Sequence, residues 1–273
     1  MELFKARIQG TGKYHPEKIM TNDELTKLVD TSDEWIVQRT GIKERRVSDV
    51  SKNEAPSGMA ERAAKMAIKN AGIEPNDIEL ILFSVTLPDM LFPNAASCLQ
   101  EKLGITNKCG ALDVNAACTG WVYALTMANS LIQTGVYKNI LVCGTEMASS
   151  FNNWDDRNTC VLFGDGSGAI VLSRANENEE SQIIDSILTS DSSKKESLIL
   201  PCGGSKRPVR QDVLDENAQW MSMDGAVVFK NAVKTMSSHC ATLLKRNNMT
   251  VEDIDWFIPH QANLRIIETT GNL

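Results

Sequence analysis

Hydrophobic and polar positions along the chain fall into two alternating patterns, which predict helices and buried strands in turn. Small and apolar residues recur at helical spacing over residues 54–72, and Gly72 follows as a stop signal. A turn at residues 73–77 leads into the apolar run 78–85, which is typical of a strand buried on both faces. Helix, turn and strand in this order indicate a layered α/β protein.

The same unit recurs near the end of the sequence. Residues 227–246 predict a helix, residues 249–253 a turn and residues 254–258 a strand. Aligning the two sequence segments also matches polar positions, namely Asp77 with Asp253, Glu79 with Asp255 and Ser84 with His260. Because the turn chemistry matches together with the pattern, we predict an internal duplication.

Further elements are predicted between the two units. Apolar runs at residues 140–144 and 169–172 predict buried strands, and residues 118–134 predict a central helix that is apolar on all sides. The glycine-rich segment 164–168 precedes the second of these strands. It lacks the Gly-Lys-Ser/Thr ending of a phosphate-binding loop, so we predict a tight turn between strands.

The length of 273 residues suits two packed halves better than one small core. The segment 174–182 is polar and charged, and we predict that it connects the two halves. The N-terminal half would then span residues 1–173 and the C-terminal half residues 183–273. Within the second half, residues 189–218 predict an irregular excursion.

Composition favours a globular protein and narrows the choice of partners. Hydrophobic residues make up 42% of the chain and charged residues 23%, which disfavours disorder. The net charge is −7, so nucleic acid is not expected as a partner. No apolar stretch approaches the roughly 20 residues that span a bilayer, and the N-terminus has no apolar signal segment. We therefore predict a cytoplasmic protein without a membrane partner.

Candidate chemistry begins with the cysteines. There are seven of them and no Cys-x-x-Cys pair, so free thiols are expected and zinc ribbons are not supported. Cys98, Cys143 and Cys160 lie in apolar runs and are predicted to be small buried hydrophobes. Only Cys118 lies where a strand pattern gives way to a helix pattern. Free N–H groups at a helix start favour thiolate, so Cys118 is the predicted nucleophile.

A base for this thiol is offered by one of three histidines. His260 follows a predicted strand and Pro259, at the kind of strand end where α/β proteins place their sites. His15 lies in a turn and His239 in a predicted helix, and both suit surface or structural roles. The sequence alone leaves open whether Cys118 and His260 share one site.

Three motifs in a fixed order carry a family resemblance: Asn115-Ala-Ala-Cys118-Thr-Gly120, Phe163-Gly-Asp-Gly-Ser-Gly168 and Pro259-His-Gln-Ala-Asn263. With the segment Ser32 to Arg45, they resemble β-ketoacyl-acyl-carrier-protein synthase III, which initiates type II fatty-acid synthesis. The resemblance implies a thiolase-like α/β fold with two related halves in five αβαβα layers. It implies that Cys118 takes an acyl group from acyl-CoA. His260 would then assist decarboxylative condensation with malonyl-acyl carrier protein.

Further site residues are implied by the same resemblance. CoA and its pantetheine arm would contact Trp35, Arg39, Arg157, Gly225 and Asn263. A surface for docking the acidic carrier protein would include Lys230, Gln261 and Arg265, with Lys234 as a neighbour. Phe92 would cross a homodimer interface into the partner's acyl pocket. No metal and no cofactor is implied, since acyl-CoA is a substrate.

Each of these implied roles has a simpler alternative. Trp35 could be a partly exposed residue of an amphipathic helix, and Arg157 a surface charge. Asn263 could cap a helix, and Phe92 could belong to the core. The spacing and composition of the surrounding residues do not decide between these alternatives, and they do not predict the acyl-chain preference.

The end of the chain departs from the family pattern. The family's third catalytic residue is an asparagine in an Asn-Thr-Ser-Ala-type motif some tens of residues beyond the histidine. Neither this motif nor the family's second glycine-rich oxyanion loop occurs before Leu273. We therefore expect an incomplete version of a longer protein that lacks the last part of the C-terminal half. The alternatives are a catalytically crippled CoA- or carrier-binding protein and another thiolase-fold acyl-CoA enzyme.

Overall fold

The computed structural model describes residues 3–272 and divides into two compact units. The first unit comprises the chain up to Lys18 and the segments Arg46–Met147 and Asp165–Leu188. The second comprises Ile19–Arg45, Ala148–Gly164 and the chain from Thr189 onward. The chain therefore passes between the units several times, and the predicted connector 174–182 lies inside the first unit. The halves 1–173 and 183–273 remain a prediction.

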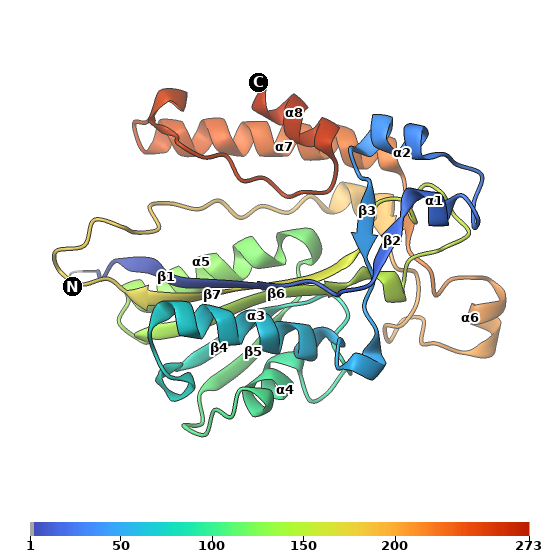
Figure 1. Ribbon diagram of the computed structural model, residues 1–273. Helices are drawn as coiled ribbons and strands as arrows, with labels where there is room; N and C mark the ends of the chain where they lie inside the picture. The colour runs from blue at the N-terminus through green and yellow to red at the C-terminus, as the bar shows by residue number, and fades with distance from the viewer. Residues whose placement is uncertain (1–2, 273) are drawn as a thin grey trace. The chain divides into compact units, whose positions relative to one another are not determined.

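A five-stranded mixed sheet forms the centre of the first unit (Figure 1). Its strands, in spatial order, are β1 (Ala6–Tyr14), β7 (Asp165–Arg174), β6 (Asn139–Met147), β4 (Leu80–Ser84) and β5 (Gly110–Val114). β4 runs parallel to β5 and β6, whereas β7 is antiparallel to β6 and β1. The strands predicted from the runs 78–85, 140–144 and 169–172 are thus confirmed.

Three helices cover this sheet: α3 (Pro56–Ala71) and α4 (Ala95–Lys102) on one face, and α5 (Gly120–Gln133) on the other (Figure 1). Along β4, Ile81 and Phe83 are buried against the α3 and α4 side, and Leu80 and Leu82 against α5. Both faces of β4 are therefore covered, which explains why its sequence is continuously apolar. The predicted helix 54–72 is confirmed as α3.

The glycine-rich segment 164–168 is not the tight turn that its composition predicts. Gly166 and Gly168 lie within β7, and Gly168 is paired with Lys13 of β1 and Gly144 of β6. The glycines adopt extended backbone because strands flank β7 on both sides and use its N–H and C=O groups.

β1 lies so close to α3 that no side chain fits at Gly12. A Cβ there would lie 2.0 Å from the carbonyl oxygen of Ala63 and 2.6 Å from the amide nitrogen of Ala67. Both are backbone atoms inside a helix, so neither can move aside without disturbing α3. The glycine therefore fixes the distance between the helix and the edge strand of the sheet.

Replacing Gly12 by alanine is expected to lower the free energy of unfolding by about 3 kcal/mol, as overpacking against backbone does. Gly168→Ala is the matched control, because a Cβ at Gly168 has no atom within 4 Å. Urea and thermal denaturation of the two variants measure the difference. Equal midpoints for both variants would show that α3 and β1 are not packed as closely as described.

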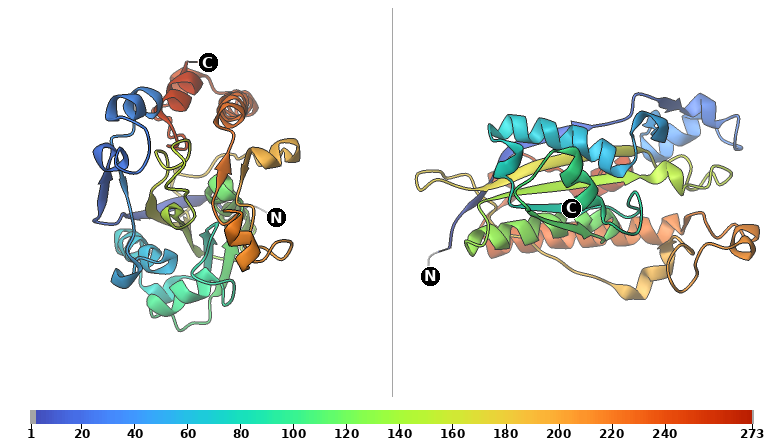
Figure 2. Two further views of the ribbon diagram at one scale, coloured as in Figure 1. Left: turned by 90° about the vertical axis from the view of Figure 1, so that its right-hand side faces the viewer. Right: turned by 90° about the horizontal axis from the view of Figure 1, so that it is seen from below.

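The second unit contains short strands and several helices. The strands are β2 (Ile19–Thr21), β3 (Glu44–Arg46), β8 (Leu198–Ile199) and β9 (Ser222–Met223), which pair as β2–β3 and β8–β9. The α-helices are α1 (Asn22–Leu25), α2 (Asp33–Thr40), α6 (Gln211–Asp215), α7 (Gly225–Arg246) and α8 (Leu264–Gly271). α7 and α8 pack against each other (Figures 1 and 2). The segment 189–218 is largely irregular, as predicted.

The duplicated unit is confirmed in its helix and its turn. α3 and α7 each lead into one turn of 3-10 helix, η2 (Pro75–Asp77) and η6 (Val251–Asp253). In η2, the Asp77 carboxylate accepts the N–H of Glu74 at 2.9 Å. In η6, the Asp253 carboxylate accepts the N–H of Thr250 at 2.8 Å. The same acidic cap therefore closes both turns.

The strand predicted at residues 254–258 is wrong for the described structure. No strand within residues 3–272 pairs with this segment, so its backbone forms no ladder. Its alternate side chains have no sheet to face, and Trp256 and Ile258 are 83% and 81% exposed. The five-stranded sheet of the first unit is the only large sheet in the described residues. The second large sheet of the expected five layers is therefore not formed there.

No helix within the described residues is both long enough and apolar enough to cross a membrane.

Candidate active site

Cys118 lies in one turn of 3-10 helix, η3 (Ala117–Thr119), between the end of β5 and the start of α5. The preceding residue, Ala117, has a φ of 45°, in the left-handed region that residues with a Cβ rarely adopt. Cys118 is a free thiol that reaches solvent, although the surrounding protein atoms remove much of the hydration of its sulfur. The predicted strand-to-helix setting is therefore confirmed, with a strained turn in place of a first helical turn.

The start of α5 rests on the ends of two neighbouring strands. A Cβ at Gly120 would lie 2.3 Å from the Ser84 hydroxyl of β4. On β6, a Cβ at Gly144 would lie 3.0 Å from the Trp121 ring. Ser84 and Gly144 are register partners in the parallel pair β4–β6. These contacts hold the Cys118 turn at the carboxyl ends of parallel strands, where α/β proteins place their sites.

A carboxylate that sequence reasoning missed lies at the same edge of the sheet. One oxygen of Glu146, in β6, accepts hydrogen bonds from the backbone N–H of Thr86 at 2.8 Å and from its hydroxyl at 2.6 Å. The other oxygen is buried and has no partner among the described residues. Burial raises the pKa of Glu146. The available signal was an acidic residue two positions after the buried strand pattern 140–144.

The pKa of Cys118 is raised, contrary to the expectation from its place at a helix start. Burial is the main cause, and the negative charge of Glu146 adds to it. The hydrogen bond from the backbone N–H of Cys118 acts in the opposite direction but is outweighed. Loss of hydration disfavours the thiolate, and so does a nearby carboxylate. The side chain is therefore a neutral thiol at neutral pH.

His260 follows the segment 254–258 and belongs to the second unit. The residue reaches solvent, yet partial burial lowers the pKa of its imidazole. The ring is therefore neutral at neutral pH and presents one N–H donor. Cys118 belongs to the first unit, and the pairing of the two residues remains a prediction.

Three of the residues implied in CoA binding lie together in the second unit. The Arg39 guanidinium lies 4.7 Å from the centroid of the Trp35 ring, and the Arg157 guanidinium 4.9 Å from it. Arg157 also donates a hydrogen bond to the carbonyl oxygen of Asp30 at 2.9 Å. An indole between two guanidinium groups combines an aromatic surface with positive charge.

Comparison with known proteins decides which family this arrangement belongs to. The family described as 3-Oxoacyl-[acyl-carrier-protein (ACP)] synthase III matches residues 112–192, and its C-terminal region matches residues 244–272. The β-ketoacyl-[acyl-carrier-protein] synthase III of Caldanaerobacter subterraneus subsp. tengcongensis is 46% identical over 267 residues. That alignment covers 98% of this chain and 79% of the relative. The chain belongs to the β-ketoacyl-acyl-carrier-protein synthase III family.

Other relatives agree with this assignment. The synthase III of Natranaerobius thermophilus is 46% identical over 271 residues, which cover 99% of this chain and 82% of the relative. The crystal structure of the Aquifex aeolicus enzyme has 38% identity and a TM-score of 0.87, and the match covers 98% of this chain and 80% of that one. The chain is therefore a member of a family of condensing transferases and has a thiolase-like α/β fold, as the sequence motifs predict.

Asn263 caps a helix in the synthase III chain. Its side-chain oxygen accepts the N–H of Arg265 at 2.9 Å at the start of α8, and its amide donates to the Arg39 carbonyl oxygen at 3.2 Å. The helix-cap alternative is thus confirmed, and the same residue ties α8 to α2. Gly225 is the first residue of α7, directly after its cap Asp224. Pantetheine contacts of Asn263 and Gly225 remain predictions.

The predicted carrier-docking residues are all exposed. Lys230 and Lys234 lie on α7, Arg265 on α8 and Gln261 in the segment before it. The Arg265 guanidinium lies 5.6 Å from the centroid of the Phe229 ring of α7. Basic groups from both packed helices therefore reach solvent in the second unit.

Phe92 is 84% exposed, so the core alternative for this residue is wrong in the described structure. The neighbouring Leu91 is 79% exposed. Both lie in the segment between β4 and α4, on a part of the first unit that presents apolar side chains to solvent. A role of Phe92 across a dimer interface remains a prediction.

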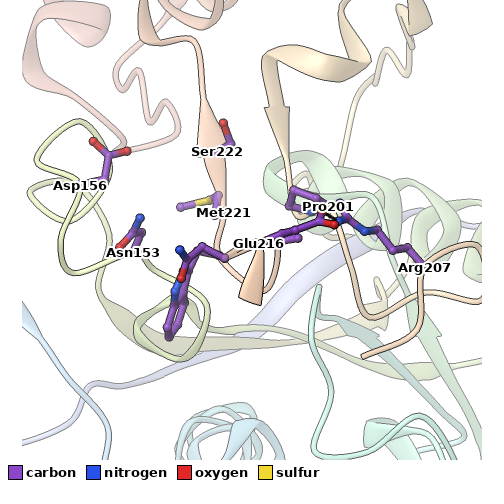
Figure 3. Close-up of a pocket in the computed structure, with 10 residues that line it drawn as sticks. Asn153, Asp156, Pro201, Arg207, Glu216, Met221 and Ser222 are labelled. Atoms are coloured by element: carbon purple, nitrogen blue, oxygen red, sulfur yellow. Dashed lines mark hydrogen bonds and ion pairs between the residues drawn. The ribbon is translucent and has the colours of Figure 1, made fainter. Parts of the chain in front are cut away.

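A surface pocket of about 290 Å³ lies elsewhere in the second unit (Figure 3). None of the predicted site residues lines it. Its charged groups are already engaged, because Arg207 pairs with Glu216 and the Asp156 carboxylate accepts the N–H of Asn158. We therefore do not assign catalysis to this pocket. Within residues 3–272, no cluster of three or more His, Cys, Asp or Glu side chains is placed to hold a metal ion.

Proposed function

We propose that this chain catalyses the initiating condensation of type II fatty-acid synthesis, with Cys118 as the nucleophile. Cys118 takes the acyl group of an acyl-CoA, and the acyl-enzyme condenses with malonyl-acyl carrier protein. The products are β-ketoacyl-acyl carrier protein, CO₂ and CoA. The observation that carries the proposal is the strained Cys118 turn at the carboxyl ends of parallel strands, in a chain of the synthase III family.

The chemistry divides into two steps. In the first, the Cys118 sulfur attacks the thioester carbonyl, a new C–S bond forms and CoA leaves with a proton. In the second, loss of CO₂ from the malonyl group leaves an enolate, which attacks the acyl carbonyl on Cys118. A C–C bond forms, the C–S bond to Cys118 breaks, and the released sulfur takes a proton from solvent. The neutral His260 imidazole donates its N–H to the thioester oxygen on which the enolate charge develops. The backbone N–H of Cys118 is a donor for the tetrahedral oxyanion of the acyl group.

The Trp35 cluster supplies the CoA end of the site. The indole offers a flat surface to the adenine ring, and the guanidinium groups of Arg39 and Arg157 attract the phosphates. The cluster recognises the nucleotide end of CoA, which does not react. It therefore contributes binding energy rather than chemistry.

Replacing Trp35 by alanine is expected to raise the KM for acetyl-CoA about tenfold, the effect of losing roughly 1.4 kcal/mol of stacking, with little change in kcat. Acetyl-pantetheine lacks the nucleotide, so its KM should not change. Steady-state kinetics with both substrates measure the effect. Trp256→Ala removes an exposed indole of the same unit and serves as the control. A similar loss with both substrates would contradict the nucleotide role.

Two partners complete the proposal. The exposed basic residues of α7 and α8, Lys230, Lys234 and Arg265, supply a cationic surface on a protein of net charge −7. Such a local patch suits the acidic carrier protein. A second copy of the chain would cover the exposed Phe92 segment, so that Phe92 enters the acyl pocket of the partner.

Intact-mass analysis after incubation with acetyl-CoA tests the first step. An acetyl adduct that peptide mapping assigns to Cys118 is the expected result. Addition of malonyl-acyl carrier protein should then remove the adduct and give acetoacetyl-acyl carrier protein. Absence of any adduct would overturn the nucleophile assignment, and an adduct that persists would overturn the condensation step.

A further inference from the structure

Thr86 lies two residues beyond the end of β4, and Glu146 lies near the end of the neighbouring parallel strand β6. Ser84 of β4 is the register partner of Gly144 of β6, and Thr86 and Glu146 each follow two residues later. Hydrogen bonds from the Thr86 backbone and hydroxyl fix one carboxylate oxygen of Glu146 at this level. The start of α5 packs against this Ser84–Gly144 pair. The Thr86–Glu146 pair therefore lies at the same strand ends as the Cys118 turn.

The hydrogen bonding of Glu146 is asymmetric. Its Oε1 accepts both donors of Thr86, whereas its Oε2 is buried and has no partner among the described residues. A buried carboxylate oxygen without a donor is costly, because lost hydration is not replaced. Such an atom is a ready acceptor for a proton that becomes available nearby.

The charged surroundings of Glu146 come from two elements. Asp165 of β7 pairs with Met147, the residue that follows Glu146 in β6. Burial raises the pKa of Glu146, and the negative charge of Asp165 raises it further. Cys118 of η3 is the other titratable group that interacts with Glu146, and the Glu146 charge adds to burial in raising the pKa of its thiol. Thr86 opposes these effects through its donors. Glu146 thus couples electrostatically to the nucleophile.

We propose that Glu146 is the general base for Cys118, receiving the thiol proton and returning it to the leaving group during acyl transfer. The inference rests on the proposed function of Cys118. At rest, the thiol keeps its proton and Glu146 is a carboxylate. As the sulfur attacks the thioester, the S–H proton passes to Glu146 Oε2 and a C–S bond forms. The bond to CoA then breaks, and the CoA sulfur takes the same proton, so that Glu146 is again a carboxylate.

The proposal predicts opposite effects of Glu146→Gln on two reactions of one thiol. Removing the negative charge makes the thiolate easier to form, so iodoacetamide should alkylate Cys118 about tenfold faster at pH 7. Removing the proton acceptor should slow acylation by acetyl-CoA about 10²-fold. A residue with a merely structural role would not speed one reaction while slowing the other.

The experiment follows both reactions on the 273-residue chain by intact mass and peptide mapping, over a range of pH. Glu146→Asp keeps the charge but shortens the side chain by one methylene, so alkylation should stay as slow as in the unsubstituted protein while acylation falls. Glu61→Gln makes the same chemical change at an α3 residue paired with Lys65, and it should alter neither reaction. Cys118→Ala gives the background from the other thiols, and thermal denaturation checks that each variant is folded.

The outcomes separate this inference from the function on which it rests. An unsubstituted protein that is not acylated on Cys118 overturns the proposed function, while its alkylation profile still tests the electrostatic coupling. Normal acylation of Cys118 together with an unchanged alkylation profile in Glu146→Gln overturns the inference alone. Parallel losses in both reactions also overturn it, because they indicate a structural role.

Discussion

Replacing Cys118 by alanine is expected to abolish the acetyl adduct and to lower the condensation rate by about 10⁴-fold or more, as removal of a covalent nucleophile does. The reason is that both steps use the same sulfur, first as the attacking atom and then as the carrier of the acyl group. Intact mass measures the adduct, and release of CO₂ from malonyl-acyl carrier protein measures the second step.

The neighbouring thiols provide the control for this experiment. Cys98 lies on α4 of the same unit and is partly exposed. Cys98→Ala should retain the adduct and most of the condensation rate. Cys118→Ser keeps the size of the side chain but supplies a much weaker nucleophile, so its acylation should be slow rather than absent. Acylation that survives in Cys118→Ala would move the chemistry to another residue.

The elements of the first unit could be predicted because local sequence and tertiary packing agree there. The run 78–85 is apolar throughout, and β4 is buried on both faces by helices. The segment 254–258 carries the same pattern but forms no strand, because strand formation needs a partner and none is present in the described residues. The hydrophobic pattern therefore indicates which side chains a segment would bury as a strand. Whether the strand forms depends on a partner strand supplied by the rest of the fold.

The prediction of a tight turn at the glycine-rich segment 164–168 was wrong for a related reason. Glycine permits a turn but does not require one, and β1 and β6 hold Gly168 in an extended ladder. Gly12 shows the opposite case, in which close approach to α3 demands glycine. A sequence without its neighbours does not distinguish these two uses of glycine.

The candidate site was predictable where its residues carry a recognisable motif. Cys118 is at the strand-to-helix boundary, and the Trp35 cluster forms although Arg157 is far from Trp35 in sequence. Glu146 was missed because an acidic residue shortly after a strand pattern does not by itself indicate that its carboxylate lies near the thiol. The direction of the Cys118 pKa was wrong because burial, to which the Glu146 carboxylate adds, outweighs the backbone donor.

His260 differs from Cys118 in the step that it is expected to serve. Partial burial lowers the pKa of His260 below its usual value of 6.5. At neutral pH its imidazole is therefore uncharged and offers a single N–H donor. Such a donor stabilises an oxygen on which negative charge develops, and this happens when the malonyl group loses CO₂. Acylation of Cys118 does not pass through that enolate.

His260→Ala is accordingly expected to keep acylation of Cys118 by acetyl-CoA while condensation falls about 10³-fold, the typical cost of losing one oxyanion donor. In the unsubstituted protein, the condensation rate should change little from pH 8 down to the usual histidine value of 6.5. It should fall only below that value, because a lowered pKa keeps the ring neutral over the higher range. His239→Ala, which removes an imidazole of α7 that contacts Thr189, is the control and should retain both steps. Equal losses of acylation and condensation in His260→Ala would show that the imidazole serves Cys118 itself rather than the malonyl group.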